Sequence, residues 1–393
     1  MSNGPVVGLE DLKNLKGLLF SRSEIERYME EEERHDIKIL TKGRKQALRT
    51  MSSGEQKKAL LDHILQKNPD FLILVNPFDN LDQETQSTLR SKLNTIGSSK
   101  VLVQFISRLE DMLPGTNGFF HLQGNRLNPY ASGEELGKDR GNPNSSFTGT
   151  LPLAIHAEER PAGALIHFDG VSVSFEGRRV LEQIHWEVRT GEFWQLIGPN
   201  GSGKSTLLSM ITGDSHKGYG QKLYLFGHKK GSGESVWDLK KKIGYFAPAI
   251  TDGFRGYHTL EHMVISGLHD SIGLYVVPSD TERKLAQDWL RLLGLYKQSE
   301  MYFRELSPGA KRLVMLARAM VKHPPLLILD EPTAGLDDSS ASLLIALVNK
   351  IAEESNTAII FVSHRKEPGL RARMHYILEP GKNGSLGKTI KNS

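Results

Sequence analysis

The sequence predicts an α/β fold in which helices cover a parallel β-sheet, and it predicts that this fold occurs twice along the chain. Three observations support the prediction. Short, continuous apolar runs alternate with stretches that have helical periodicity. A glycine-rich stretch connects one apolar run to one helical run. Finally, a set of short motifs recurs in the same order at a constant spacing.

The glycine-rich stretch is the most informative part of the chain. It reads Gly198-Pro199-Asn200-Gly201-Ser202-Gly203-Lys204-Ser205-Thr206. It follows the strand-like run 193–197 and opens the helix-like run 207–211, the context that a phosphate-binding loop requires. Glycines let backbone N–H groups turn around a polyphosphate, and the helix N-terminus adds positive potential. We predict that Lys204 lies along the β- and γ-phosphates and that the Ser205 hydroxyl coordinates Mg²⁺. A plain turn before a core helix is the alternative.

Composition sets outer bounds on structure and function. The 393 residues suffice for two domains, and 38% hydrophobic and 24% charged residues are typical of globular proteins. There are no cysteines, which excludes disulfides and thiolate metal sites. No apolar run is long enough to span a bilayer and no signal-peptide pattern opens the sequence. These features predict a location in the cytoplasm, or peripherally at the cytosolic face of a membrane where another subunit supplies the pore.

The first part of the chain contains few clear elements. Residues 57–67 carry leucines and isoleucine at helical spacing. The apolar runs 71–75 and 101–106 predict buried strands. From about residue 129 to residue 163 the composition shifts to Gly, Pro, Ser, Asn and charge, which predicts a linker. A complete second domain is predicted over residues 164–393.

The second part alternates more regularly. Residues 171–175 and 180–188 predict strands ahead of the glycine-rich loop. Ser279 and Glu282 predict a capping box that begins a helix. A helical run over 312–322 leads into the buried strand 326–329.

The two parts repeat one another. Ser307 follows Ser52 by 255 residues, Asp337 follows Asp82 by 255, and His364 follows Arg108 by 256. The corresponding stretches are Leu306-Ser307-Pro308-Gly309-Ala310 with Met51-Ser52-Ser53-Gly54-Glu55, and 326–332 with 71–77. A constant offset over this length indicates a duplication.

The first copy, residues 1–128, is predicted to be a truncated and degenerate domain. At the same offset its phosphate loop would fall before residue 1, and Val75 and Asn76 stand where the second copy has Asp330 and Glu331. In the family that the chain resembles, identified below, the strand before the phosphate loop lies beside the equivalent of 101–106, so the resemblance implies that 101–106 presents an unpaired apolar edge. Three explanations of this edge are open: another chain covers it, the first domain is only marginally folded, or the recorded start of the sequence is not the natural one.

These residues resemble the ATP-binding-cassette (ABC) ATPases, and the resemblance implies a P-loop fold with added antiparallel β and helical subdomains. It also implies the following roles: Gly198–Thr206 as the Walker A loop, Asp330 as the Mg²⁺ ligand of Walker B, Glu331 as the catalytic base, Ala334–Asp337 as the D-loop, His364 as the switch histidine, Phe175 as the adenine-stacking aromatic, and Ser52 and Ser307 as signature-loop serines. More narrowly, stretches such as Gly231–Asp238 and Asp270–Gly273 resemble tandem-cassette proteins of the ModF/PhrA type, linked by name to molybdate transport and photorepair.

Each role has a structural alternative. Phe175 could be an ordinary core aromatic, and His364 an ordinary surface or core histidine. Asp330 and Glu331 could be an acidic strand end. Ser307 could simply cap the helix that follows it.

The leading functional hypothesis is one composite site that hydrolyses ATP with Mg²⁺. The second domain would hold the nucleotide, and Ser52 and Gly54 of the first would close over it. Head-to-tail pairing of second domains from two chains, a homodimer, is the other arrangement. The cycle would drive an unidentified partner, such as a membrane subunit of a molybdate-type transporter. Ile243–Pro248 lacks the glutamine that transporter ATPases carry after an Ile-Gly-Tyr run, however, which weakens the transport reading. A cassette ATPase acting on the ribosome or nucleic acid, and a scaffold that binds nucleotide without hydrolysis, are the alternatives.

Overall fold

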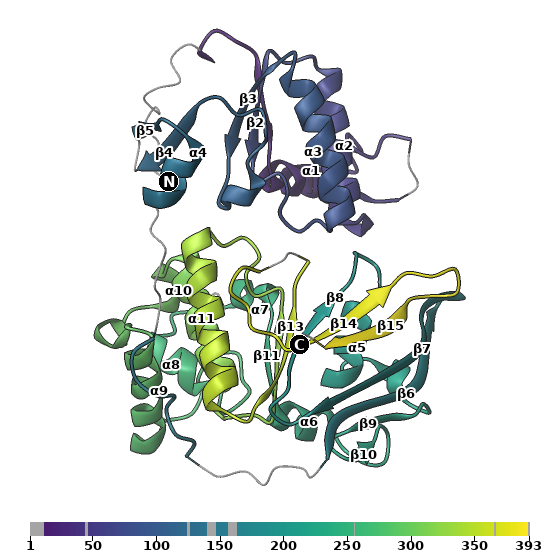
Figure 1. Cartoon of the computed structure of the whole chain (residues 1–393), viewed down its shortest axis with the longest axis vertical. Coiled ribbons are helices and arrows are strands. Elements are labelled where there is room, and N and C mark those ends of the chain that lie inside the picture. The colour runs from purple at the N-terminus through teal and green to yellow at the C-terminus, as the bar shows by residue number, and fades with distance from the viewer. Residues whose placement is uncertain are drawn as a thin grey trace. The chain divides into compact units, whose positions relative to one another are not determined.

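The computed structural model describes residues 12–43, 46–123, 126–139, 147–155, 163–254, 256–364 and 367–391. The chain divides into two compact units (Figure 1). One unit comprises Met1–Pro143 with Asp337–Ser339, and the other comprises Asn144–Leu336 with Ser340–Ser393. None of the helices in the described ranges combines the length and apolar character that crossing a bilayer requires.

The second unit is built on a six-stranded sheet. Its order is β11 (Ile243–Phe246), β12 (Leu326–Asp330), β13 (Ala358–Val362), β8 (Phe193–Ile197), β14 (Met374–Glu379) and β15 (Leu386–Lys391). The first five strands pair in parallel, and β15 pairs antiparallel with β14. Side chains of β13 alternate between two hydrophobic clusters, with Phe361 in one and Ile360 in the other. Strand β13 is therefore buried on both faces of this sheet.

Helices cover one face of the six strands, and a second sheet packs on the other face together with the helices that carry Leu207 and Leu239 (Figure 1). The helices are α5 (Lys204–Thr212), α6 (Val236–Lys242), α7 (Pro248–Gly253), α8 (Leu260–Ile265), α9 (Asp280–Leu292), α10 (Pro308–Met320) and α11 (Asp338–Glu354). The second sheet is antiparallel, with the order β10 (His228–Lys229), β9 (Leu223–Leu225), β6 (Ala164–Phe175) and β7 (Arg178–Arg189). The capping box predicted at Ser279 and Glu282 begins α9 as expected. Helix α10 begins four residues earlier than the predicted run, because Ser307 caps it and Pro308 suits the first helical turn.

The first unit has a three-stranded parallel sheet in the order β1 (Gly17–Phe20), β2 (Phe71–Val75) and β3 (Val101–Phe105). Its helices are α1 (Arg22–His35), α2 (Ser53–Gln66), α3 (Gln83–Gly97) and α4 (Gly133–Asp139), and β4 (Phe119–Gln123) pairs with β5 (Arg126–Tyr130) in a separate hairpin. Part of β5 and all of α4 fall inside the segment predicted as a linker. Residues 140–146 and 156–162 of that segment lie outside the described residues.

The two units share backbone detail at equivalent positions. Left-handed φ angles occur at Asn76 (42°) and Glu331 (49°), which are 255 residues apart. The same offset relates Asn80 to Gly335 and Asn68 to His323, all of which have positive φ. Their sheets correspond as well, with β1, β2 and β3 in the order of β11, β12 and β13. Equivalent turns in equivalent places support the duplication inferred from the sequence.

Candidate functional site

The glycine-rich loop joins β8 to α5, as the sequence predicts. At two positions of this loop, steric clashes exclude any residue other than glycine. A Cβ at Gly203, where φ is 97°, would lie 2.5 Å from Leu181 Cδ2, and a Cβ at Gly198 would lie 2.6 Å from Ser202 Oγ. The chain can therefore turn tightly there only without side chains. The loop places the N-terminus of α5 at the carboxyl end of β8, and the first backbone N–H groups of a helix point away from it toward any ligand bound there.

Lys204 begins α5, and its side chain folds back over the loop. Its Nζ donates hydrogen bonds to the carbonyl oxygens of Gly198 (2.6 Å) and Pro199 (3.0 Å). The side chain is nearly buried, so these carbonyls hold the ammonium group inside the loop rather than in open solvent. A cation fixed within a ring of backbone amides is suited to an anionic ligand with several oxygens.

The sheet register brings three strand ends together. Val362 at the end of β13 pairs with Asp330 on one side and with Leu196 on the other. The carboxyl ends of β12, β13 and β8 therefore meet at one edge, where the glycine-rich loop begins. This is the edge at which open α/β sheets bind ligands.

Glu331 and His364 form an ion pair at this edge, between Glu331 Oε1 and His364 Nε2. The Glu331 backbone is held by a hydrogen bond from its N–H to the carbonyl of Val362 (2.9 Å). Its left-handed φ is unfavourable for a glutamate, and positions of this kind are enriched at functional sites. The His364 side chain is almost buried, and its Nδ1 has no hydrogen-bond partner among the described residues. Of the described side chains, Glu331 is therefore the one that orients the imidazole.

Asp330 lies beside this pair in a less polar environment. Burial, and then the neighbouring Glu331 carboxylate, raise the pKa of Asp330 above its usual value. The Tyr245 hydroxyl at the end of β11 donates to Asp330 Oδ2 over 3.4 Å, and burial followed by the Asp330 charge raises the pKa of Tyr245. No sequence motif singles out Tyr245. The pairing of β11 with β12 places it there, a relation that only the sheet order reveals.

The donor set fits Mg²⁺. A partly desolvated carboxylate at Asp330 and the Ser205 hydroxyl on the first turn of α5 are hard oxygen ligands of the kind that Mg²⁺ prefers. No cluster of three or more His, Asp or Glu side chains able to hold a metal occurs in the part of the chain that the structure describes.

Phe175 ends β6 and is not a core residue. Its ring is 42% exposed, and Lys217 Nζ lies 5.1 Å from the ring centroid. The core alternative for Phe175 is therefore wrong, because a core aromatic would be enclosed on both faces.

Ser52 and Ser307 are both helix N-caps. The Ser52 Oγ accepts a hydrogen bond from Glu55 N (3.3 Å) at the start of α2, and Ser307 Oγ accepts one from Ala310 N (3.3 Å). Gly54 has a packing reason of its own, since a Cβ there would lie 2.9 Å from Thr85 Cγ2 on α3. The capping alternative considered for Ser307 is thus present in the structure, and it applies equally to Ser52.

The first unit differs from the second at the position of the acidic pair. Asn76 occupies the place of Glu331, and its side chain is bound in both directions by Ser107. Its Nδ2 donates to Ser107 Oγ (3.0 Å) and its Oδ1 accepts from Ser107 N (2.9 Å). The amide side chain of Asn76 is not basic, so it cannot accept a proton as the Glu331 carboxylate could.

Comparison with known proteins gives the same picture. The family model described as ABC transporter matches residues 181–334. The ABC transporter ATP-binding protein ModF of Escherichia coli (strain K12) is 39% identical over 335 residues, which cover 81% of this chain and 67% of ModF. The uncharacterized ABC transporter ATP-binding protein C323.04 of Schizosaccharomyces pombe is 28% identical over 333 residues, covering 82% of this chain and 66% of that protein. The uncharacterized protein YlmA of Bacillus subtilis is 34% identical over 204 residues, or 52% of this chain and 77% of YlmA.

The match to ModF extends across both units at an identity that establishes common ancestry, and the phosphate loop falls within the region matched by the family model. The chain therefore belongs to the ATP-binding-cassette family of ATPases, and within that family it is of the ModF type.

Proposed function

We propose that the second unit hydrolyses ATP to ADP and phosphate by the concerted action of Lys204, Glu331 and His364. Lys204 would move from the loop carbonyls to the β- and γ-phosphates, where its charge offsets that of the transferred phosphoryl group. Glu331 would accept a proton from the attacking water. His364, already paired with Glu331, would fix the orientation of that carboxylate and contact the γ-phosphate.

The observation that carries this proposal is the Glu331–His364 pair at the strand edge that bears the phosphate loop. Glu331→Gln keeps the size of the side chain and removes its basicity. We expect unchanged ATP affinity by equilibrium dialysis and a loss of phosphate release on the order of 100-fold or more. An unaltered rate of phosphate release would rule out Glu331 as the base.

Mg²⁺ and adenine complete the proposed ligand. Ser205 and Asp330 would hold Mg²⁺, which when bound neutralises charge on the phosphates. Phe175 would stack on the adenine. Its exposed ring supports this, because a face that is not packed against the core is open to a base. The remaining loop residues, Gly198, Pro199, Asn200, Gly201, Ser202, Gly203 and Thr206, would contribute the phosphate cradle.

We further propose that the first unit, as a degenerate copy, serves as a lid, with Ser52 and Gly54 closing over the γ-phosphate bound to the second unit. The N-terminal amides of α2 would add positive potential at that point. The support is the repeat itself, which preserves the Ser-x-Gly helix start while the acidic pair of the first copy is lost. Closure would then convert ATP binding into a movement of the two units.

The repeat offers a matched test of this lid. Aspartate caps a helix about as well as serine does, so Ser307→Asp should leave stability nearly unchanged. Ser52→Asp also replaces the hydrogen bond from Ser52 Oγ to Glu55 Oε2 with two facing carboxylates, so the Tm of this variant is measured beside its turnover. Of the two introduced aspartates, only the one that faces the γ-phosphate should repel this phosphate. We expect Ser52→Asp to lower ATP turnover at least 10-fold and Ser307→Asp to have little effect. The reverse result would indicate pairing of second units from two chains, and no effect from either variant would exclude both arrangements.

The partner driven by this cycle is proposed by analogy with the ATP-binding proteins that the chain resembles. ModF is named as an ABC transporter ATP-binding protein, which supports a membrane subunit as partner. Molybdate as the candidate cargo and a location at the cytosolic face of a membrane are proposed from the sequence resemblance alone. Pull-down with Glu331→Gln in the presence of ATP would identify the partner. Recovery of ribosomes or nucleic acid in place of a membrane protein would favour the non-transport alternative.

A further inference from the structure

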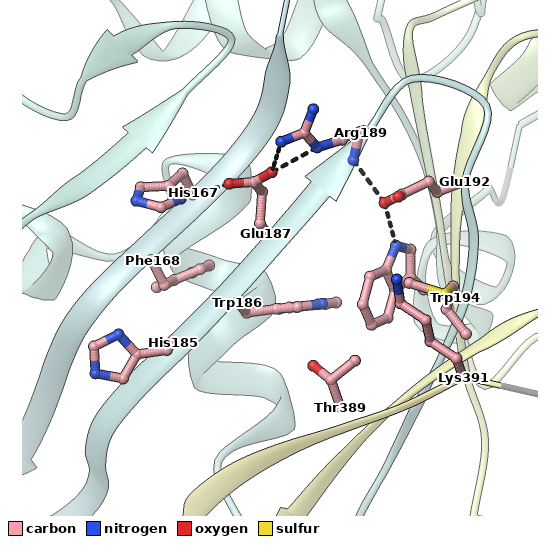
Figure 2. Close-up of a pocket in the computed structure, with 11 residues that line it drawn as sticks. His167, Phe168, His185, Trp186, Glu187, Arg189, Glu192, Trp194, Thr389 and Lys391 are labelled. Carbon is pink, nitrogen blue, oxygen red and sulfur yellow. Dashed lines mark hydrogen bonds and ion pairs between the residues drawn. The ribbon is translucent and has the colours of Figure 1, made fainter.

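A cavity lies within the second unit, between the antiparallel sheet and the strands β8, β14 and β15 (Figure 2). Its volume is about 470 Å³, which is within the range of small-molecule sites. The wall includes Trp186 from β7 and Trp194 from β8, with Thr389 and Lys391 from β15. Trp194 stands near the start of β8, whereas the phosphate loop follows the end of this strand. The cavity is therefore distinct from the ATP site.

The cavity has an apolar floor. Trp186 stacks on Tyr376 with ring centroids 4.5 Å apart, and Trp194 meets Trp186 edge-on at 5.7 Å. Both indoles are almost completely buried. Phe168 and Tyr376 stack on the two faces of Trp186, so this indole is rigidly held and only its edge can border the cavity.

The acidic groups around the cavity are already engaged. Glu187 Oε1 accepts from the Arg189 guanidinium (2.6 Å), and its Oε2 lies 3.2 Å from His167 Nδ1. Glu192 Oε2 accepts from Trp194 Nε1 (2.9 Å) and from Arg189 N (2.8 Å). A ligand that needs hydrogen-bond acceptors from the protein would have to break these contacts.

The donors, in contrast, are not all used. The indole N–H of Trp186 has no hydrogen-bond partner among the described residues, and Figure 2 shows its nitrogen-bearing edge directed toward the side of the cavity that carries Trp194 and Lys391. Lys391 is exposed and has no carboxylate within ion-pair distance in the described part of the chain. A buried donor without an acceptor is unfavourable, and a cation beside it adds to the demand for negative charge.

From this arrangement we propose that the cavity binds a small organic anion, with an aromatic or other flat apolar body and one carboxylate or phosphate group. The body would lie in the cavity beside Met374 and the edges of the indoles, and the anionic oxygens would accept from Trp186 Nε1, Thr389 Oγ1 and Lys391 Nζ. Trp186 Nε1 is shielded from solvent, so the anion must displace side chains at the opening. Lys391 and Met374 are long and unbranched and can move at little cost.

Tryptophan fluorescence of the full chain tests the proposal. The chain has four tryptophans, and Trp237→Phe removes the exposed one, which leaves Trp186 and Trp194 as reporters beside the core residue Trp289. The probes are benzoate and phenyl phosphate, which separate carboxylate from phosphate chemistry, and benzyl alcohol is the uncharged analogue. Titrations are run at constant ionic strength in the Trp237→Phe protein, and calorimetry gives the stoichiometry.

We expect saturable binding of at least one anion at one site per chain, with at least 10-fold weaker binding of benzyl alcohol. Lys391→Met should weaken the anion at least 10-fold, whereas Lys388→Met, a matched change on the same strand outside the cavity wall, should not. Trp186→Phe keeps the ring and removes the N–H, and it should weaken the anion as well. Absence of saturation with both anions, equal affinity for benzyl alcohol, or equal affinity in Lys391→Met would each overturn the proposal.

Discussion

Glu331 shows how the site keeps a residue that its backbone does not favour. The equivalent position in the first unit has the same left-handed conformation but carries Asn76, and asparagine tolerates this region better than most residues do. Glutamate has no such advantage, and the cost of a residue in a sparsely populated region is about 1–3 kcal/mol. The second unit therefore holds Glu331 for its carboxylate, whereas the first unit has the residue that suits the turn.

Asp330, like Glu331, should lower the stability of the folded protein. Burial raises its pKa, so the folded protein binds the proton of this carboxyl more tightly than the unfolded chain does. Asp330 therefore contributes most to stability at pH values below the pKa that its carboxyl has in the unfolded chain. This contribution is lost as the pH rises through the higher pKa of the same carboxyl in the folded protein. At neutral pH the ionised carboxylate destabilises the nucleotide-free protein.

Asp330→Asn should accordingly raise the Tm of the nucleotide-free protein at pH 7 by on the order of a few degrees, while ATP turnover is lost. The gain should shrink as the pH is lowered toward the pKa of a free aspartate. Asp238→Asn is the control, because hydrogen bonds from Ser235 lower the pKa of Asp238, so its neutralisation should not stabilise the protein. Thermal melts from pH 4 to pH 8 measure both variants. An unchanged or lower Tm for Asp330→Asn at pH 7 would contradict the argument.

At the scale of elements, the sequence predicts the parts that have a strong local signal. Strands β2 and β12 are continuous apolar runs and are largely buried, and α9 carries a capping box. Strand β3 forms where it is predicted, but the prediction that it is buried is wrong, because it lies at the edge of its sheet and is partly exposed. Strand β1 escapes prediction, since four residues that begin with glycine give too little pattern. The hairpin β4–β5 and helix α4 escape it as well, because these elements are short and the hairpin is mostly exposed, so they carry neither a long apolar run nor a helical period.

The site is predictable to a similar degree, for a related reason. The phosphate loop is local in sequence and has fixed spacing, so the motif alone places Lys204 and Ser205 at the start of a helix. The pairing of Glu331 with His364 depends on the register of β12 and β13, and the contact of Tyr245 with Asp330 depends on β11 lying beside β12. Such relations between distant segments are set by sheet order, which composition and periodicity do not contain.

Strand β3 is an exposed edge in the first unit. Its counterpart β13 is paired on both sides, with β12 and with β8, whereas β3 pairs only with β2 within the described residues. Val101 on this edge is 51% exposed. An unpaired apolar edge favours association with other strands.

Val101→Lys should therefore reduce self-association, because a charge on the edge disfavours strand addition. We expect a smaller apparent mass at micromolar concentration by light scattering, with the ATPase rate per chain unchanged. Lys100→Met, which removes a charge next to the same strand, should have the opposite effect or none. Equal association of Val101→Lys and the parent protein would show that this edge is not an adhesive surface.

For the whole molecule, the duplication predicts one nucleotide per chain despite two related units. The second unit has the glycine-rich loop, the acidic pair Asp330 and Glu331, and His364. In the first unit Asn76 is bound on both sides by Ser107, and the buried Arg108 stands where the second unit has His364. Rearranging the first unit into a catalytic site would break both Asn76–Ser107 hydrogen bonds and still supply neither acidic group.

Equilibrium dialysis of Glu331→Gln with radiolabelled ATP and Mg²⁺ should therefore saturate at one ATP per chain, whether or not chains associate. Lys204→Ala in the same background should abolish binding, because the loop loses its only ammonium group directed at the phosphates. Ser52→Asp should lower the affinity without changing the stoichiometry, since the lid contributes contacts but no second site. Saturation at two ATP per chain, or residual binding of one ATP by the Lys204→Ala protein, would mean that the first unit holds nucleotide by a mechanism that its residues do not reveal.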